Sequence, residues 1–173
     1  MDRSQAVDTP LQTLLLQRNG WVPNNPRLPV LIYIKAIAAE GSDPTALFEE
    51  IFNANGWPPQ WRDGIYDYHH YHTQGHEVLG IASGYAHVML GGPEGRVLEV
   101  SAGDVLLLPA GTGHCNLRAS DDFLVVGAYP PGQHADICRK APSPEQLRNI
   151  EQLTFPEQDP VPGQPGAVRR YWM

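Results

Sequence analysis

The sequence has little of the chemistry that marks secreted or membrane-bound proteins. It contains two cysteines, Cys115 and Cys138, with no CxxC spacing, so neither a disulfide scaffold nor a four-thiolate zinc site is expected. The longest apolar runs, Val30–Ile34 and Val105–Leu108, are far shorter than the roughly 18 residues that a membrane span requires. No basic segment followed by an apolar one opens the chain. We therefore expect no membrane association and a cytoplasmic location.

Basic side chains are also few. The 12 Lys and Arg are outnumbered by 19 Asp and Glu, which gives a formal net charge of −7. No basic cluster is longer than the pair Arg169-Arg170, so nucleic acid is not expected as a partner. No GxSxG, P-loop or GxGxxG motif precedes a helix, which removes support for serine hydrolase, nucleotide phosphoryl transfer and Rossmann redox chemistry.

Turn-forming residues, in contrast, are abundant, but the 17 prolines are unevenly distributed. Seven lie in residues 1–59 and eight in residues 130–173, which leaves only Pro93 and Pro109 between them. Proline cannot donate to a strand ladder, so a continuous sheet is expected in this middle region. Short β-prone segments separated by glycines lie there: Glu77–Ala82, Tyr85–Leu90, Val97–Ser101, Val105–Leu108 and Phe123–Tyr129. Their regular spacing predicts an all-β sandwich or barrel.

Two short helices are expected outside this region. Ser42-Asp43-Pro44 and Ser143-Pro144 each offer a cap followed by proline in the first helical turn. We also expect a strand over Val30–Ile37 and an extended tail from Pro156. The chain is thus divided into an N-terminal extension packing on the barrel (strand plus helix), the barrel core, and a C-terminal helix with a proline-rich tail: residues 1–60, 61–131 and 132–173.

Histidine is concentrated in one part of the chain, since five of the seven lie between residues 69 and 87. Side chains alternate faces along a strand, so His70 and His72 share a face and can converge on one ion. After a bend at residues 73–75, Glu77 can return a carboxylate to the same place. His114 follows a glycine-rich turn and can complete the set. Three neutral imidazoles and one carboxylate suit a divalent first-row transition metal with up to two open positions.

At this point a resemblance becomes specific. The run Gly64-x5-His70-x-His72-x4-Glu77-x6-Gly84 resembles the first cupin motif, and Gly103-x5-Pro109-x-Gly111-x2-His114 resembles the second through its histidine. Arg118 stands where the cupin pattern has an asparagine. A narrower resemblance, to the small YjlB-like bacterial cupins, is carried by residues 76–80 and 122–130.

The resemblance implies a fold and a ligand set. The fold would be a double-stranded β-helix, the cupin or jelly-roll barrel, with one or two short flanking helices. Inside it, His70, His72, Glu77 and His114 would hold one divalent transition metal ion, namely Fe, Mn, Ni or Zn. Among cupins such a site supports dioxygenase, isomerase or lyase chemistry on a small molecule. The alternative is a non-catalytic module that binds a metal or a metabolite.

Three further expectations concern the surroundings of this site. Alternation places Tyr68 on the face of His70, so we expect Tyr68 to orient a substrate by hydrogen bonding. His76 is left open between a metal ligand, a partner of a ligand, and a surface residue. Apolar residues flanking the barrel and its open sheet edges predict a homodimer. A small molecule is the other expected partner.

Overall fold

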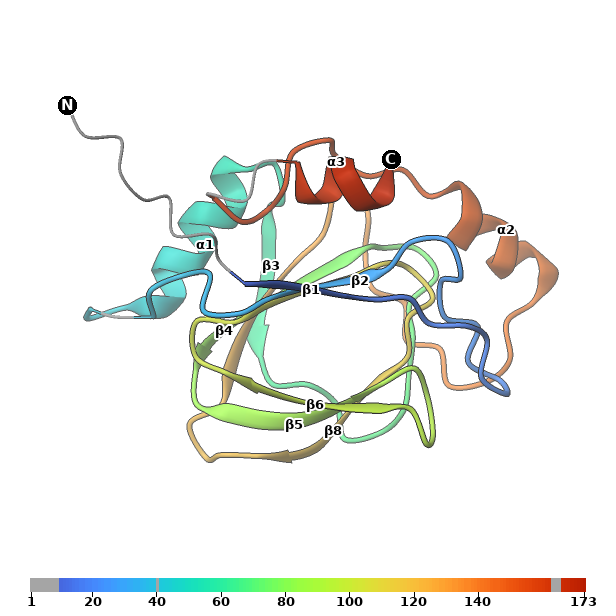
Figure 1. Cartoon of the computed structure of the whole chain (residues 1–173), viewed down its shortest axis with the longest axis horizontal. Helices are drawn as coiled ribbons and strands as arrows, with labels where there is room; N and C mark the ends of the chain where they lie inside the picture. Colours follow the sequence, from blue (N-terminus) through green and yellow to red (C-terminus); the bar gives the residue numbers. More distant parts are fainter. Residues whose placement is uncertain (1–9, 40, 163–165) are drawn as a thin grey trace.

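The computed structural model describes residues 10–39, 41–162 and 166–173, and within them nine strands form two antiparallel sheets (Figure 1). The strands are β1 (Leu11–Leu14), β2 (Val30–Tyr33), β3 (Pro59–Asp63), β4 (Glu77–Ser83), β5 (Tyr85–Leu90), β6 (Arg96–Ser101), β7 (Val105–Leu108), β8 (His114–Ala119) and β9 (Leu124–Ala128). The larger sheet has the order β1-β2-β7-β4-β9-β3, and the smaller β6-β5-β8. This is the all-β, double-stranded β-helix that the sequence predicts.

The central strands of the larger sheet, β2, β7, β4 and β9, are buried on both faces. On β7, Leu106 and Leu108 pack between the two sheets, whereas Val105 and Leu107 pack on the opposite face with the helices. Because both faces exclude water, the strand is a continuous apolar run rather than an alternation of apolar and polar residues. The smaller sheet covers only the barrel side.

Three helices lie on the outer side of the larger sheet and at its end (Figure 1). They are α1 (Pro44–Ala54), α2 (Pro144–Gln152) and α3 (Ala167–Trp172). The first two begin as predicted, since Asp43 caps α1 through the Ala46 N–H and Ser143 forms a capping box at the start of α2. Helix α1 packs closely on β4 at Gly80, where an added Cβ would lie 2.4 Å from the Phe48 ring.

Some elements differ from the expectations. The sequence patterns predicted neither β1, β3 and β8 nor α3, so the flanking helices number three in the described residues instead of one or two. Helix α3 also interrupts the tail that was expected to be extended. Strand β2 ends at Tyr33 rather than Ile37, because the chain turns at Lys35 with a φ of 52°. The division at residues 60 and 131 stays a prediction, and β3 crosses its first boundary.

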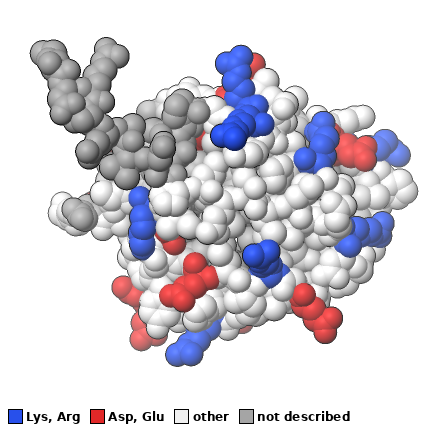
Figure 2. All heavy atoms as spheres, viewed as in Figure 1, with Lys and Arg blue, Asp and Glu red and all other residues white. Residues whose placement is uncertain are grey.

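Two remaining expectations concern the ends of the chain and its surface. The start of the chain, residues 1–9, and Pro165 in the tail lie outside the described residues. None of the helices in the described part is long and apolar enough to cross a membrane. On the face shown in Figure 2, basic and acidic side chains are interspersed among the described residues.

The C-terminal segment is held to the larger sheet by one buried carboxylate. Asp159 accepts a hydrogen bond from the Tyr33 hydroxyl at 2.7 Å, and it also accepts from the backbone N–H groups of Val161 and Val168 at 2.9 and 3.2 Å. Burial raises the pKa of Asp159, although these three donors oppose the shift. Each of these three hydrogen bonds therefore offsets part of the free-energy cost of burying the Asp159 carboxylate.

Replacing Tyr33 with Phe removes one of these donors and leaves the carboxylate buried. We expect Tyr33→Phe to lower the free energy of unfolding in urea by about 1–3 kcal/mol. Tyr85→Phe is the matched control, because Tyr85 is 42% exposed, and it should have almost no effect. Equal midpoints for the two variants would show that Asp159 does not depend on Tyr33.

Candidate metal centre

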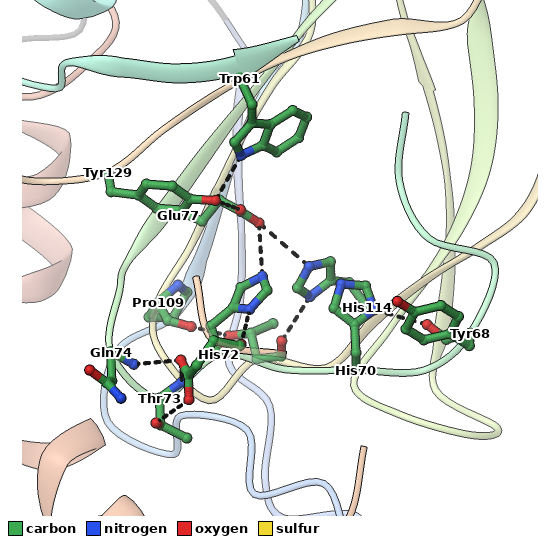
Figure 3. Close-up of polar contacts among 12 residues, drawn as sticks. Trp61, Tyr68, His70, His72, Thr73, Gln74, Glu77, Pro109, His114 and Tyr129 are labelled. Atoms are coloured by element: carbon green, nitrogen blue, oxygen red, sulfur yellow. Dashed lines mark hydrogen bonds and ion pairs between the residues drawn. The ribbon is translucent and has the colours of Figure 1, made fainter. Parts of the chain in front are cut away.

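Three histidines meet at one end of the barrel, between the two sheets. His70 and His72 lie in the irregular segment between β3 and β4, whereas His114 begins β8. The backbones of His70 and His114 bond to each other in both directions, at 3.2 and 3.0 Å. All three side chains are buried, and one nitrogen from each lies within 4.8 Å of the others (Figure 3).

The second nitrogen of each ring faces a backbone carbonyl. The Nδ1 atoms of His70, His72 and His114 lie 2.9, 2.6 and 3.0 Å from the carbonyl oxygens of Tyr68, Asp136 and Thr112 respectively. A carbonyl oxygen can only accept, so each Nδ1 carries a proton. In the neutral ring the lone pair is then on Nε2, the atom that is free to bind a metal.

The fourth candidate ligand, Glu77, begins β4 and faces two of these imidazoles. Its Oε1 lies 3.4 Å from Nε2 of His72 and 3.5 Å from Nε2 of His114 (Figure 3). Two atoms that each bind one ion at about 2.1 Å are separated by about 3.4 Å when the angle between them is tetrahedral. The observed spacing, which is also that of an ion pair between Glu77 and a charged imidazole, is compatible with two ligands of one ion.

The electrostatics of the site favour cation binding. Burial, together with the neighbouring His114, lowers the pKa of His70 to about 2, so this imidazole is neutral and available as a ligand. Burial acts to raise the pKa of Glu77, but His72 and His114 hold it well below its usual range. For His72, burial lowers the pKa and Glu77 raises it, with a net upward shift. The buried carboxylate is therefore ionised and requires a positive charge beside it, which a proton on His72 or a metal ion supplies.

The four candidate residues have the chemistry that a metal ion requires. The donors are three imidazole nitrogens with fixed tautomers and one ionised carboxylate, all of them buried. Such a mixed nitrogen and oxygen set suits iron, manganese, nickel or zinc. The four ligands that the sequence motif implies are thus brought together by the fold.

The carbonyl that holds His72 belongs to a segment that follows β9. This segment crosses the irregular one, with Tyr71 and Cys138 bonded backbone to backbone at 3.0 Å in both directions. The Asp136 carboxylate accepts from the N–H groups of Thr73 and Gln74 and from the Thr73 hydroxyl. Although burial opposes the shift, these donors lower the pKa of Asp136. Asp136 thereby locks the segment that carries the carbonyl.

A cavity of about 420 Å³ opens over the four candidate ligands. Its walls are mostly aromatic and aliphatic: Trp61, Ile65, Tyr66, Leu79, Ala135 and Ile137. Leu79 on β4 lines the cavity, whereas Ile81, Ala86, Val88 and Leu106 pack into the closed core between the sheets.

Two residues that sequence reasoning missed lie at the carboxylate. The Tyr129 hydroxyl donates to Glu77 Oε2 at 2.8 Å, and Trp61 Nε1 donates to the Tyr129 hydroxyl at 2.7 Å (Figure 3). Burial and the charge of Glu77 raise the pKa of Tyr129, so its phenol keeps its proton. Neither of the two cupin motifs that predict the ligands contains Tyr129 or Trp61. Only the pairing of β4 with β9, which joins distant parts of the chain, brings Tyr129 to Glu77.

Tyr68 lies beside His70 but is not among the described residues that line the cavity. Its ring stacks on Tyr66 at 4.9 Å, and the Arg139 guanidinium lies 3.9 Å from its centroid. Alternation does not apply to this segment, because residues 64–76 form isolated bridges rather than a strand. The role of Tyr68 in orienting a substrate stays a prediction. Asn116, two residues after His114 on β8, is also not among the described lining residues.

His76, which the sequence left open, serves the packing of the C-terminal segment. It is fully buried, its Nδ1 accepts from the Ala110 N–H at 2.9 Å, and its ring packs against Phe155 and Trp172. Its Nε2 lies 3.3 Å from the Leu153 carbonyl. Both nitrogens are therefore engaged with the backbone, and His76 has no free lone pair for a metal.

The strand order, the motif spacing and the buried ligand set together define a cupin. The chain is 34% identical to the uncharacterized protein YjlB of Bacillus subtilis (strain 168) over 164 residues, which cover 94% of this chain and 96% of that protein. The chain belongs to the YjlB family of cupins.

Other comparisons add little to this assignment. No family model matches the chain. Among solved structures, acireductone dioxygenase from Bacillus anthracis with a cadmium ion in its active centre is 19% identical, covering 53% of this chain and 59% of that one with a TM-score of 0.32. Procruciferin, an 11S globulin from Brassica napus, is 18% identical, covering 76% of this chain and 34% of that one with a TM-score of 0.38.

The position of His76 generates a prediction about stability and metal content. His76→Ala removes a buried ring from between Phe155 and Trp172 and leaves the Ala110 N–H without its acceptor, so we expect a loss of about 2–5 kcal/mol in the free energy of unfolding. Metal content per folded chain should equal that of the wild type. Loss of the metal from a variant that remains folded would show that His76 is a ligand.

Proposed function

We propose that this protein binds one divalent transition metal ion through His70, His72, Glu77 and His114. The observation that carries the proposal is the set of three carbonyl contacts that leave the Nε2 lone pairs of the histidines free, in a cluster where one ring nitrogen of each histidine lies within 4.8 Å of the others. Histidines that merely fill a core have no need of a common tautomer or of a buried carboxylate between two of them. Both features are what a metal site requires.

We further propose that the protein is an enzyme acting on a small molecule at this ion. A bound ion of this kind supplies a Lewis acid, or redox chemistry if it is iron, with coordination positions left for a ligand. The cavity above the four ligands supports this, since its volume of about 420 Å³ suits a small ligand. Its chemistry would be of the dioxygenase, isomerase or lyase type.

The cavity walls restrict what such a ligand can be. Apart from the candidate ligands they are largely apolar, with Asp63 as an acidic residue among them, and none of the described lining residues is Lys or Arg. An acidic group on the ligand therefore finds no basic side chain to pair with, and only the ion itself can neutralise it. This favours a small, partly apolar molecule that approaches the metal through an oxygen atom.

The non-catalytic alternative has a structural requirement of its own. A mouth closed by the C-terminal segment or by Trp172 would favour a structural or sensing module. Trp172 instead packs against His76 and donates to the Pro29 carbonyl at 2.8 Å. None of the described residues from 156 onward lines the cavity. An accessible cavity supports the enzyme.

The ligand assignment predicts the effect of removing two histidines. The double variant His72→Ala, His114→Ala loses the two imidazoles that face Glu77, so metal content should fall from one equivalent per chain to nearly none. The measurement is elemental analysis of protein purified without an affinity tag. His87→Ala is the matched control, because His87 lies on the outside of β5 beside Glu99. A full equivalent retained by the double variant refutes the assignment.

We also propose that the chain forms a homodimer. In the described residues β1, β3 and β6 are sheet edges without a second partner strand, whereas β8 is bonded on its free side to His70 and Tyr66. Val97 on β6 and Leu117 on β8 are about half exposed. Such edges are usually covered by pairing. Strand β2 is not such an edge, because it pairs with β1 on one side and with β7 on the other. Light scattering at low micromolar concentration should give twice the monomer mass; the monomer mass would contradict the proposal.

A further inference from the structure

The two oxygens of Glu77 have different partners. Oε1 faces Nε2 of His72 and of His114, at 3.4 and 3.5 Å, on the side where the candidate ligands converge. Oε2 points the other way and accepts the hydrogen bond of the Tyr129 hydroxyl at 2.8 Å (Figure 3). A free carboxylate can bind a metal through one oxygen or through both. In this protein one of the two oxygens is already engaged.

The Tyr129 hydroxyl is itself held in place. Trp61 Nε1 donates to it at 2.7 Å, so the oxygen of Tyr129 accepts one hydrogen bond and has its only proton to give to Glu77. Because an indole N–H is a donor and never an acceptor, Trp61 cannot take that proton. The two hydrogen bonds, which we call the Trp61–Tyr129 relay, therefore run in one direction: Trp61 donates to Tyr129, and Tyr129 donates to Glu77.

The absence of a side chain at Gly127 leaves room for the Trp61 ring in this relay. At Gly127, on β9 opposite Trp61, an added Cβ would lie 2.0 Å from the indole ring. Any other residue at position 127 would displace Trp61 from its hydrogen bond. Trp61 and Tyr129 also line the cavity, so the relay lies beside the space that a ligand would occupy. None of these residues belongs to the sequence motifs that predict the metal ligands.

We propose that Tyr129, positioned by Trp61, restricts Glu77 to binding the metal through Oε1 alone and thereby keeps a coordination position open for a ligand. This inference rests on the proposed metal site. Tyr129 is a positioning residue, because it acts on the metal through Glu77. Without its hydrogen bond, Glu77 is free to turn and to offer both oxygens to the ion.

The experiment uses cobalt(II) as the probe, because its visible absorption reports the number and arrangement of its ligands. Full-length wild-type protein and the variants Tyr129→Phe and Trp61→Phe are titrated with cobalt, and affinity is measured by competition with a chelator. We expect Tyr129→Phe to keep one equivalent of cobalt with an altered spectrum and an affinity changed by about 10- to 100-fold. Trp61→Phe should alter the spectrum in the same direction but less. Tyr85→Phe, on the outside of the smaller sheet, is the control.

The outcomes separate this inference from the proposed function. If the wild type binds no cobalt, the metal site itself is wrong and the inference fails with it. If the wild type binds one equivalent and both relay variants retain its spectrum and affinity, only the role of Tyr129 is overturned. Should Tyr129→Phe fail to fold, Trp61→Phe alone decides: an unchanged spectrum overturns the relay and a changed one supports it.

Discussion

Three hydrogen bonds from imidazole Nδ1 atoms to backbone carbonyls determine what this site can do. They place a proton on the Nδ1 of His70, His72 and His114 and so leave the Nε2 lone pairs available, in a cluster where one ring nitrogen of each histidine lies within 4.8 Å of the others. Each carbonyl must keep its position if it is to hold the proton on the Nδ1 of its histidine. Those of Tyr68 and Thr112 lie two residues from the histidine they hold, whereas that of Asp136 depends on a segment locked to Thr73 and Gln74. The fold supplies that rigidity.

The candidate metal site lies where the two sheets meet the segment that follows β9. Pairing of β4 with β9 brings the carboxylate of Glu77 to Tyr129, and the bridge between Tyr71 and Cys138 brings the segment after β9 beside the histidines. On the other side of the larger sheet, α1 and α3 bury a second core. The C-terminal segment therefore stabilises the sheet while leaving the cavity accessible, and His76 belongs to that stabilising side.

Motif spacing predicted the four candidate ligands and glycine punctuation predicted the central strands, because both are short-range features. The segment around Tyr68 was harder, since alternation holds only in a strand and residues 64–76 are not one. Tyr129 and Trp61 were not predictable, because their hydrogen bonds join residues that are 52 and 68 positions apart in the chain. His76 sits next to a ligand in sequence but faces Phe155 and Trp172. Local patterns thus predict the candidate ligands, and tertiary contacts decide which other residues bond to them.

The central claim is that one ion is bound by three Nε2 atoms and one carboxylate oxygen. Anomalous diffraction from crystals of the metal-loaded protein tests it most directly, because it locates the ion independently of the protein atoms. We predict one strong peak per chain, about 2.0–2.2 Å from Nε2 of His70, His72 and His114 and from Oε1 of Glu77. A peak bonded to an Nδ1 atom, a peak at another place, or no peak at this site in metal-loaded crystals would contradict the account.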